Sequence, residues 1–530
     1  MEHPKANRES ERKRVVKAAG VVGFSTLLSR IFGFLRDMVV AAFFGAGLAT
    51  DAFFVAFRIP NLLRSLLAEG SLTIAFVPVF TEYLDKRSKR DALELANVTF
   101  TVLSLVLAAV TVLGIIFSPF IVSVIAPGFS EDPAKYELTI FLNRLMFPYI
   151  FFISLVAFCM GILNSFRHFA APALAPVALN ISMIAAALLL RDFFEEPIIA
   201  LAVGVIAGGV LQLAMQLPVL ARKGVFLKPD FHFDHPGLKK IGRLMLPAVF
   251  GAAVYQINIF ISTLLASFLP GGSVSYLYYA DRVVQLPLGI FGIAVGTASL
   301  PSFSEQVSRG DYEDLKKTIS FSLRLILFVT VPSMAALIVL REPIISVLFQ
   351  RGAFDLSSMV LTAQALFYYA LGLWAFSGIR VVVSAFYALQ DSKTPVRVAV
   401  VALVVNAAMS VILMFPLKHG GLALATAIAS SVNILLLATL LRRKIGPFLD
   451  GEFFRSLGKV IASSILMGIV IAVVCRWMNW DSTAATVDRL AVLVTAIVTG
   501  MIVFVLSSYL LGSREITVVV ETLKRKLRRS

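Results

Sequence analysis

Apolar segments long enough to cross a lipid bilayer recur along the whole of this 530-residue chain. A bilayer core of about 30 Å needs roughly 20 apolar residues in one helix. Only 15% of the residues are charged and the mean hydropathy is +0.87, whereas soluble domains are about a quarter charged. The sequence therefore predicts an all-α polytopic membrane protein. We place fourteen spans at 17–42, 52–82, 95–118, 138–163, 170–190, 198–220, 240–268, 275–303, 316–340, 358–388, 396–415, 421–441, 456–475 and 488–511.

Basic residues concentrate in alternate gaps between these spans. About 33 of the 48 lysines and arginines fall in one set of gaps, which includes both ends of the chain, and about 7 fall in the other set. Because basic loops stay in the cytoplasm, we predict that both termini are cytoplasmic. This topology accounts for the net charge of +16, so we expect no nucleic-acid partner. The gaps are too short for a soluble catalytic domain, which favours a transporter over an enzyme.

The first part of the chain recurs in the second. Pro78 and Pro301 are 223 positions apart, as are Pro172 and Pro395, and SPFIVSVIAPGF and REPIISVLFQRGAF look like copies. Two copies of six spans keep the same orientation, so we predict two parallel six-helix lobes around a central cavity, plus two C-terminal helices. The predicted domains are an N-lobe at 1–223, a C-lobe at 224–446, and spans thirteen and fourteen with a basic cytoplasmic tail at 447–530.

Charged residues inside the spans indicate what the cavity binds. A charge at the bilayer centre costs roughly 2.5–3.5 kcal/mol on insertion scales, and chains accept it where the group has a task. Ser29 and Arg36 share one helix face, and Arg58 begins a polar stripe that ends at Glu69. The arginines of the first two spans outnumber the acids there, so the expected ligand is an anion. Guanidinium pairs with phosphate oxygens through two hydrogen bonds, which points to a diphosphate.

A purely structural role is the alternative for these arginines. Arg30 with Asp37, or Arg64 with Glu69, are candidate ion pairs that only fix helix packing. For Arg144, Arg324 and Arg380 a structural role, with the side chain reaching to an interface, is the simpler interpretation; the sequence leaves their roles open.

Other chemistry-bearing residues carry weak signals. His232 and His235 lie three apart in the segment FHFDHP without further ligands, so we expect a solvated loop and no metal site. Cys159 and Cys475 lie far apart in apolar runs and predict no disulfide. No cofactor is expected, and coupling to the membrane potential or to an ion stays open.

Several motifs together resemble one family. They are SRIFGFLRD at 29–37, FFGAGLATDAFFVAFRIPNLLR at 43–64, LLAEGSLTIAFVPVFTEY at 66–83, GILNSFRHFAAPALAPVALNISMI at 161–184, YYADRVVQLPLGIFGIAVGTASLPS at 278–302 and YALQDSKTPVRVA at 387–399. With their spacing, they look like the MurJ (MviN) family of lipid II flippases, in the multidrug/oligosaccharidyl-lipid/polysaccharide exporter superfamily. The resemblance covers nearly the whole chain.

The resemblance implies roles for particular residues. The substrate-binding residues that it implies are Ser29, Arg30, Arg36, Arg64 and Arg282; those for gating or support are Asp37, Asp51 and Glu69. Asp51 is expected to pair with an arginine and close an outward gate, and the two extra C-terminal helices to form a groove for a lipid tail. Some relatives have a sodium site with carboxylates. The corresponding region here offers only neutral groups, namely Asn258, Asn406, Ser410 and Thr426.

The function that follows is translocation of undecaprenyl-diphosphate-linked peptidoglycan precursor (lipid II) from the cytoplasmic to the periplasmic leaflet of the bacterial inner membrane by alternating access. It implies roles in cell-wall biogenesis and cell shape. The expected partners are the lipid-linked glycan, membrane lipids, and proteins of cell-wall synthesis or division. The alternatives are a flippase for another polyprenyl-diphosphate-linked glycan, a cation-coupled drug antiporter, an enzyme acting on the same lipid, and a scaffold for division proteins.

Overall fold

The computed structural model describes residues 4–64, 72–289 and 293–516, and within them every regular element is a helix. The predicted all-α class is therefore confirmed. The chain forms two compact units, Met1–Phe268 and Leu269–Ser530. The predicted domain limits at 223 and 446 follow the sequence repeat and stay a prediction.

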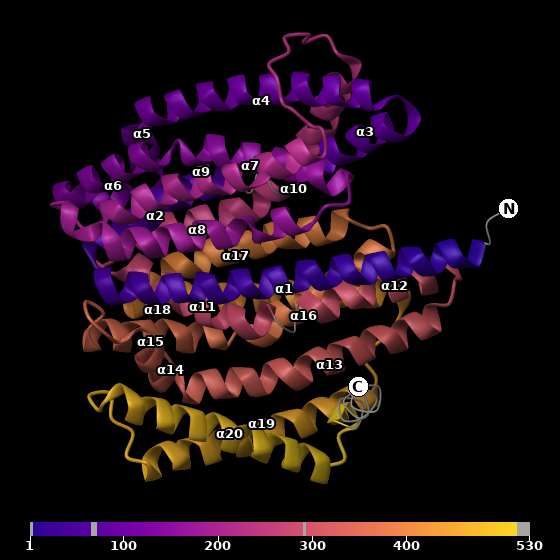
Figure 1. The fold of residues 1–530 in the computed structure, drawn as a ribbon. Helices are drawn as coiled ribbons and strands as arrows, with labels where there is room; N and C mark the ends of the chain where they lie inside the picture. Colours follow the sequence, from indigo (N-terminus) through magenta and orange to yellow (C-terminus); the bar gives the residue numbers. More distant parts are fainter. Residues whose placement is uncertain (1–3, 65–71, 290–292, 517–530) are drawn as a thin grey trace. The chain divides into compact units, whose positions relative to one another are not determined.

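The first unit holds ten α-helices, counted over its described residues (Figure 1). They are α1 (Pro4–Phe44), α2 (Leu48–Leu63), α3 (Thr73–Lys86), α4 (Lys89–Ile116), α5 (Ser118–Ile125), α6 (Pro133–Met146), α7 (Tyr149–Ser165), α8 (Ala170–Leu189), α9 (Ile199–Arg222) and α10 (Pro236–Ser267), with two 3-10 helices, η2 (Pro127–Glu131) and η3 (Arg191–Phe193). Helix α8 packs between α1 and α9, α2 packs against α6, and α3 packs against α4, α7 and α10.

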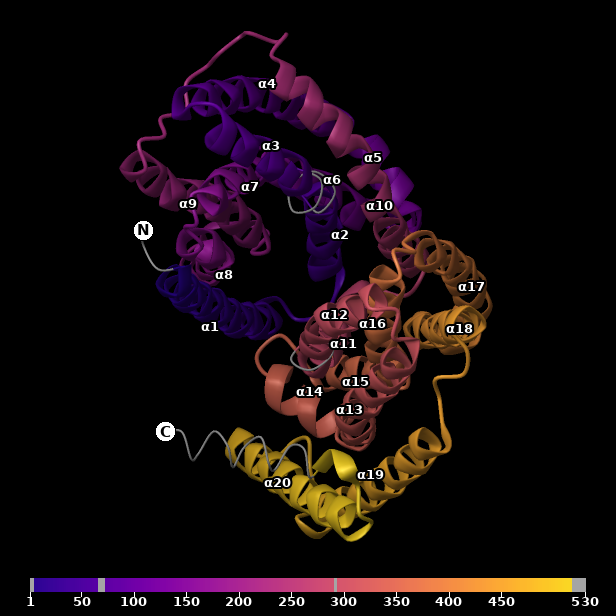
Figure 2. The same cartoon turned by 90° about the vertical axis from the view of Figure 1, so that its right-hand side faces the viewer.

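The second unit likewise holds ten helices in its described part (Figure 2). They are α11 (Ser273–Pro287), α12 (Ile293–Ser308), α13 (Tyr312–Val339), α14 (Arg341–Phe349), α15 (Leu356–Ala370), α16 (Leu373–Ala388), α17 (Lys393–Leu417), α18 (His419–Ile445), α19 (Gly451–Trp477) and α20 (Thr486–Leu510). The last two pack on each other, and α19 also lies along α13.

Nine of the described helices are long and apolar enough to cross a membrane, and the bent pair α15–α16 makes a tenth. Every one of the fourteen predicted spans overlaps at least one helix. Four predicted spans each contain two helices, α2 with α3, α6 with α7, α11 with α12, and α15 with α16. The count of fourteen itself stays a prediction.

The local structure of the second copy repeats that of the first. Helices α4 and α13 begin 223 residues apart. Helices α5 and α14 also begin 223 residues apart, and they lie in the two segments predicted to be copies. Arg167 and Gln390, also 223 apart, both adopt positive φ angles, 57° and 56°. In each copy the next amide closes the helix end: His168 donates to the Leu163 carbonyl and Asp391 to the Phe386 carbonyl. Since few non-glycine residues adopt this conformation, its recurrence at one offset supports the predicted repeat.

Aromatic side chains build the core of the first unit between α3 and α7. Phe76 and Phe158 are fully buried, with ring centroids 4.8 Å apart, and Phe80 stacks on Phe76. In the second unit α12, α13, α16 and α18 share one apolar cluster, and α13, α19 and α20 share another. Each unit therefore has its own core, which can hold its polar side chains in fixed positions.

Gly128 shows how closely the backbone packs at the end of α10. Its N–H donates to Ser267 Oγ at 3.0 Å, and a Cβ at this position would lie 2.4 Å from the Ser267 carbonyl oxygen. A backbone atom cannot move aside as the end of a flexible side chain can. Only glycine therefore fits between η2 and α10.

We predict that Gly128→Ala destabilises the protein by about 1–3 kcal/mol through overpacking. Gly242→Ala is the matched control, because a Cβ there meets nothing within 4 Å. The measurement is the Tm of each purified variant in detergent. Equal Tm values for the two variants would show that the contact between η2 and α10 is not tight in solution.

Candidate functional site

Arg36 is held in a buried polar cluster that joins α1 to α8. Its side chain donates to Asp37 Oδ1 from Nη2 at 2.7 Å and from Nε at 3.1 Å, and to Asn180 Oδ1 from Nη1 at 3.0 Å. Asn180 Nδ2 in turn donates to the Ser29 carbonyl at 3.3 Å. Arg36 is 8% exposed and Asp37 2% exposed. The cluster therefore brings three of the predicted residues together, and Asp37 neutralises the charge of Arg36 in this conformation.

Arg30 differs from Arg36 although both lie on α1. Its side chain is exposed, and it has no hydrogen-bond or ion-pair partner within 4–64, 72–289 and 293–516. The ion pair suggested for Arg30 with Asp37 is therefore not formed; the structure pairs Asp37 with Arg36 instead. Arg30 remains a guanidinium available to a ligand.

Arg64 and Asp51 lie at opposite ends of α2. Arg64 caps the C-terminal end and is half-buried, whereas Asp51 is in the first turn. Their separation of 13 positions corresponds to about 20 Å along a helix. The predicted binding and gating residues of this span are therefore well separated. Glu69, the last predicted support residue, lies outside the described residues.

Arg58 and Arg282 occupy matching positions of the two copies, 224 residues apart. Arg58 donates to the Thr263 hydroxyl of α10. Arg282 donates to the Tyr278 hydroxyl at 2.8 Å, one turn earlier on α11, and its guanidinium carbon lies 4.8 Å from the centroid of that ring. These contacts with hydroxyl groups help to orient the two guanidinium groups.

Asp51 forms a buried ion pair with Lys135. Lys135 Nζ lies 2.9 Å from Asp51 Oδ2, and the side chains are 7% and 1% exposed. The ammonium also lies 3.9 Å from the centroid of the Phe129 ring, a cation–π contact. Asp132 caps α6 by accepting from the Lys135 backbone N–H at 3.2 Å. The pair thus fixes the start of α2 against the start of α6. The expected pairing of Asp51 with an arginine stays a prediction.

Lys135 was missed in the sequence, although a signal was present. It is the only basic residue between positions 91 and 143 and lies in a gap that otherwise collects acids. The corresponding positions of the second copy are Ser275 and Ser358, both buried. The ion pair is therefore particular to the first copy of the repeat.

Arg324 forms ion pairs, which fits the structural interpretation. Arg324 Nη1 lies 2.8 Å from Glu452 at the start of α19, and its Nε lies 3.7 Å from Glu515, just beyond α20. This network ties the C-terminal helix pair to α13. Arg144 is exposed in the last turn of α6, where a cation interacts favourably with the helix dipole. Arg380 is exposed on α16.

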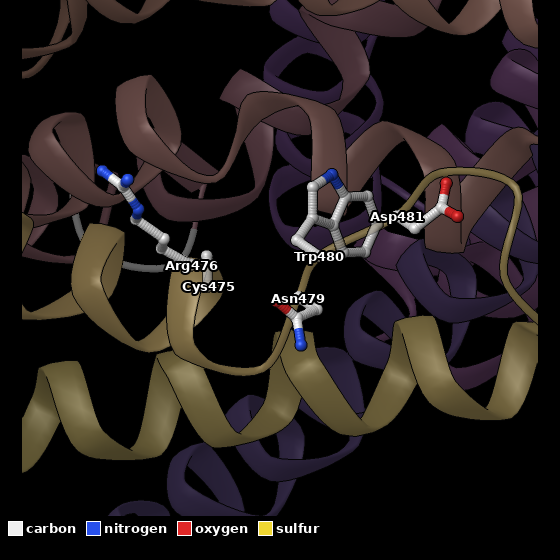
Figure 3. Close-up of a pocket in the computed structure, with 5 residues that line it drawn as sticks. All are labelled: Cys475, Arg476, Asn479, Trp480 and Asp481. Carbon is white, nitrogen blue, oxygen red and sulfur yellow. The ribbon is translucent and has the colours of Figure 1, made fainter.

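An open depression of about 600 Å³ lies at the end of α19. Its lining residues are Cys475, Arg476, Asn479, Trp480 and Asp481 (Figure 3). It contains none of the predicted site residues, and Arg476 and Trp480 point in different directions (Figure 3). Tryptophan and arginine at the end of a spanning helix are typical of a membrane–water interface.

Metal-binding chemistry is sparse in the part of the chain that the structure describes. No group of three or more His, Cys, Asp or Glu side chains gathers there. Thr426 Oγ1 of α18 lies 3.5 Å from Asn406 Oδ1 of α17. Ser410, one helical turn after Asn406 on α17, is buried. These oxygens carry no formal charge.

A family model for the lipid II flippase MurJ matches residues 40–491. The chain belongs to the MurJ family. A probable lipid II flippase MurJ from Buchnera aphidicola subsp. Acyrthosiphon pisum is 38% identical over 461 residues, which cover 87% of this chain and 90% of the relative. A second from Vibrio cholerae is 40% identical, with 80% and 82% covered. The lipid II flippase MurJ of Burkholderia cenocepacia is 37% identical, with 90% and 93% covered.

Solved structures agree with this family. A lipid II flippase MurJ in an inward closed conformation matches with a TM-score of 0.78 and 28% identity, covering 92% of this chain and 98% of that one. An inward-facing multidrug transporter of the MATE family matches with a TM-score of 0.65 and 16% identity, covering 81% and 98%, and shares the fold. With its apolar spanning helices, a chain of the MurJ family is a multi-pass protein of the bacterial inner membrane.

We predict that Lys135→Met destabilises the protein by about 3–5 kcal/mol, because it leaves the Asp51 carboxylate buried without its cation. The double variant Asp51→Leu with Lys135→Met removes both charges and should regain most of the Tm. Growth of cells depleted of the native protein separates the roles. If Asp51 also serves transport, the double variant is stable but does not support growth. A double variant as unstable as Lys135→Met would contradict the ion-pair explanation.

Proposed function

We propose that this protein is a flippase that moves lipid II from the cytoplasmic to the periplasmic leaflet. The match of residues 40–491 to the MurJ family carries the proposal. Relatives that are 37–40% identical over the aligned residues are named lipid II flippase or probable lipid II flippase. The protein would serve peptidoglycan biosynthesis, and proteins of cell-wall synthesis or division are its expected partners.

The charges of the described side chains support an anionic headgroup as the ligand. Asp37 compensates the charge of Arg36, so the positive charge of α1 that supports an anionic ligand is that of Arg30. The exposed Arg30 side chain, which has no hydrogen-bond or ion-pair partner among the described residues, is the single geometric observation that most favours an anion. A diphosphate matches the paired donors of guanidinium. Ser29 would hold the substrate beside Arg30.

Alternating access is the proposed mechanism. Each unit moves as a body because it has its own core, and the cavity opens to one leaflet at a time. Asp51 with Lys135 holds the start of α2, where an outward gate is expected, while Asp37 keeps Arg36 oriented. Both termini are placed in the cytoplasm, and the lipid tail follows the groove of α19 and α20.

The membrane potential is the proposed driving force. An inside-negative potential favours export of an anion by about 2.3 kcal/mol per charge per 100 mV. Coupling to an ion is the alternative, and the neutral oxygens of Asn406 and Thr426 on α17 and α18 are the groups to vary in testing it.

The deciding experiment asks which leaflet holds the lipid precursor after depletion of the protein. Accumulation of lipid II in the cytoplasmic leaflet supports the proposal. Normal lipid II translocation, with accumulation of a different polyprenyl-diphosphate-linked glycan, would assign another substrate. Normal translocation with failed polymerisation would indicate an enzyme.

We predict that Arg282→Ala abolishes growth in the depleted strain while the protein still inserts in the membrane at a normal level. Arg282→Lys keeps the charge but loses the paired donors, so we expect it to rescue growth only partly. Arg144→Gln is the control, because Arg144 is exposed at a helix end and should support normal growth. Full growth with well-expressed Arg282→Ala would contradict a role in binding the substrate.

A further inference from the structure

The loop at 223–235, which joins α9 and α10, is fastened along the outside of α4. Lys89 Nζ donates to the Lys223 carbonyl at 3.0 Å, the Lys228 N–H donates to Asn97 Oδ1 at 3.0 Å, and the Asp230 N–H donates to Thr101 Oγ1 at 2.7 Å. Residues further along the loop thus contact residues further along α4. In both views the loop passes over the outer side of α4 (Figure 1, Figure 2).

The loop then turns back toward the start of α4. The His235 ring lies 5.6 Å from the Tyr83 ring of α3, and Gly237 packs so closely on Leu95 that a Cβ there would lie 2.7 Å from Leu95 Cδ1. Lys240 forms an ion pair with Glu82 at 2.6 Å. The loop therefore runs along α4 as far as Thr101 and then turns back, and the segment around Asp230 is its tip.

The tip lies beside the part of α4 that crosses the membrane. Charged residues of α4 end at Glu94, and the run from Leu95 to Ile116 is uncharged, which corresponds to about 33 Å of helix. Thr101 is six residues into this run, or about 9 Å. Only 22% of the most apolar window of α4 is buried in the protein. Its exposed apolar side chains begin at Leu105 and Val106, one turn beyond Thr101, so lipid reaches the helix just past the tip. Segments that lie in a membrane interface bury their apolar side chains by about 5–10 Å.

The loop has one apolar side chain that packs into the protein and three that are exposed, as expected for a segment at a membrane interface. Val225 is 3% exposed and packs into the core of the first unit. Phe226, Phe231 and Phe233 are 63%, 64% and 49% exposed, and the last two meet edge to face with centroids 6.0 Å apart. Three exposed phenylalanines in one short loop form a patch that water would solvate poorly.

The polar groups at the tip are mutually satisfied. His232 Nδ1 lies 2.6 Å from Asp230 Oδ1. This hydrogen bond raises the pKa of His232 and lowers the pKa of Asp230, so the two together tend toward a neutral ion pair.

Two basic residues in and after the loop are available to anionic headgroups. Lys228 and Arg243 are exposed and have no carboxylate partner in the described part of the chain.

We propose that the 223–235 loop is a membrane anchor that inserts Phe226, Phe231 and Phe233 into the bilayer interface beside α4, with Lys228 and Arg243 binding the phosphates of anionic phospholipids. A solvated loop, which the sequence suggested, would not need exposed phenylalanines pinned along a lipid-facing helix. The anchor does not depend on which lipid the protein carries, and it fixes the connection between α9 and α10 at the membrane surface.

Tryptophan fluorescence tests the insertion. The three native tryptophans, Trp374, Trp477 and Trp480, are changed to phenylalanine, and Phe231→Trp is introduced as the reporter. Tyr312→Trp is the matched control, because Tyr312 is 45% exposed in the charged first turn of α13. In vesicles with acyl chains brominated near the headgroup, Phe231→Trp should be quenched at least about twofold more than the control, and acrylamide should quench it less.

Two outcomes would overturn the proposal. In the first, acrylamide quenches Phe231→Trp and bromolipid does not, and Phe233→Trp, the second reporter, behaves in the same way. This result would place the tip in water, as expected for a loop that docks a soluble protein. For the headgroup contact, brominated phosphatidylglycerol should quench more than brominated phosphatidylcholine at the same fraction. The double variant Lys228→Gln with Arg243→Gln should remove that difference. Equal quenching by the two lipids in the unaltered loop would exclude binding of anionic headgroups.

Discussion

The cost of burying charge away from water is the constraint on which the rest of this structure depends. Moving an ion into a protein interior costs several kcal/mol unless a partner compensates it. Arg36 meets Asp37, Asp51 meets Lys135, and Arg324 meets Glu452 and Glu515. Arg489, which is 8% exposed, is surrounded by the neutral oxygens of Ser346, Gln350, Ser482 and Thr486. These contacts link helices that apolar packing alone would leave free to slide.

The charged contacts are distributed unequally over two copies of one scaffold. The copies share helix order, the break between α5 and α6 or α14 and α15, and the positive φ angles of Arg167 and Gln390. Yet the positions of Asp51 and Lys135 hold serines in the second copy. The shared features concern the path of the backbone, whereas the differences concern ionisable groups. We infer that the repeat supplies the framework and that the first copy carries most of the specialised chemistry.

Partners across the fold explain why site prediction from the sequence was incomplete. Residue type and helical spacing were enough to select Arg36 and Asp37 as candidates, and the resemblance to the family added Asp51. Their contacts with Asn180 and Lys135 join residues that are 144 and 84 positions apart, and no periodicity within one helix indicates such pairs. The same limit applies to the 223–235 loop, whose hydrogen bonds to α4 join residues 131 and 129 positions apart.

Hydropathy, charge placement and the internal repeat determined the all-α membrane class and the approximate helix limits, while the motifs carried the resemblance to the family. The first three could do so because a chain in lipid must satisfy its backbone hydrogen bonds within each helix, and this requirement is local and leaves a period in the sequence. Only the tertiary structure decided which arginine is neutralised, which lysine holds Asp51, and where the phenylalanines of the loop lie. Those outcomes depend on packing between distant segments, where a shift of one helical turn would exchange every partner.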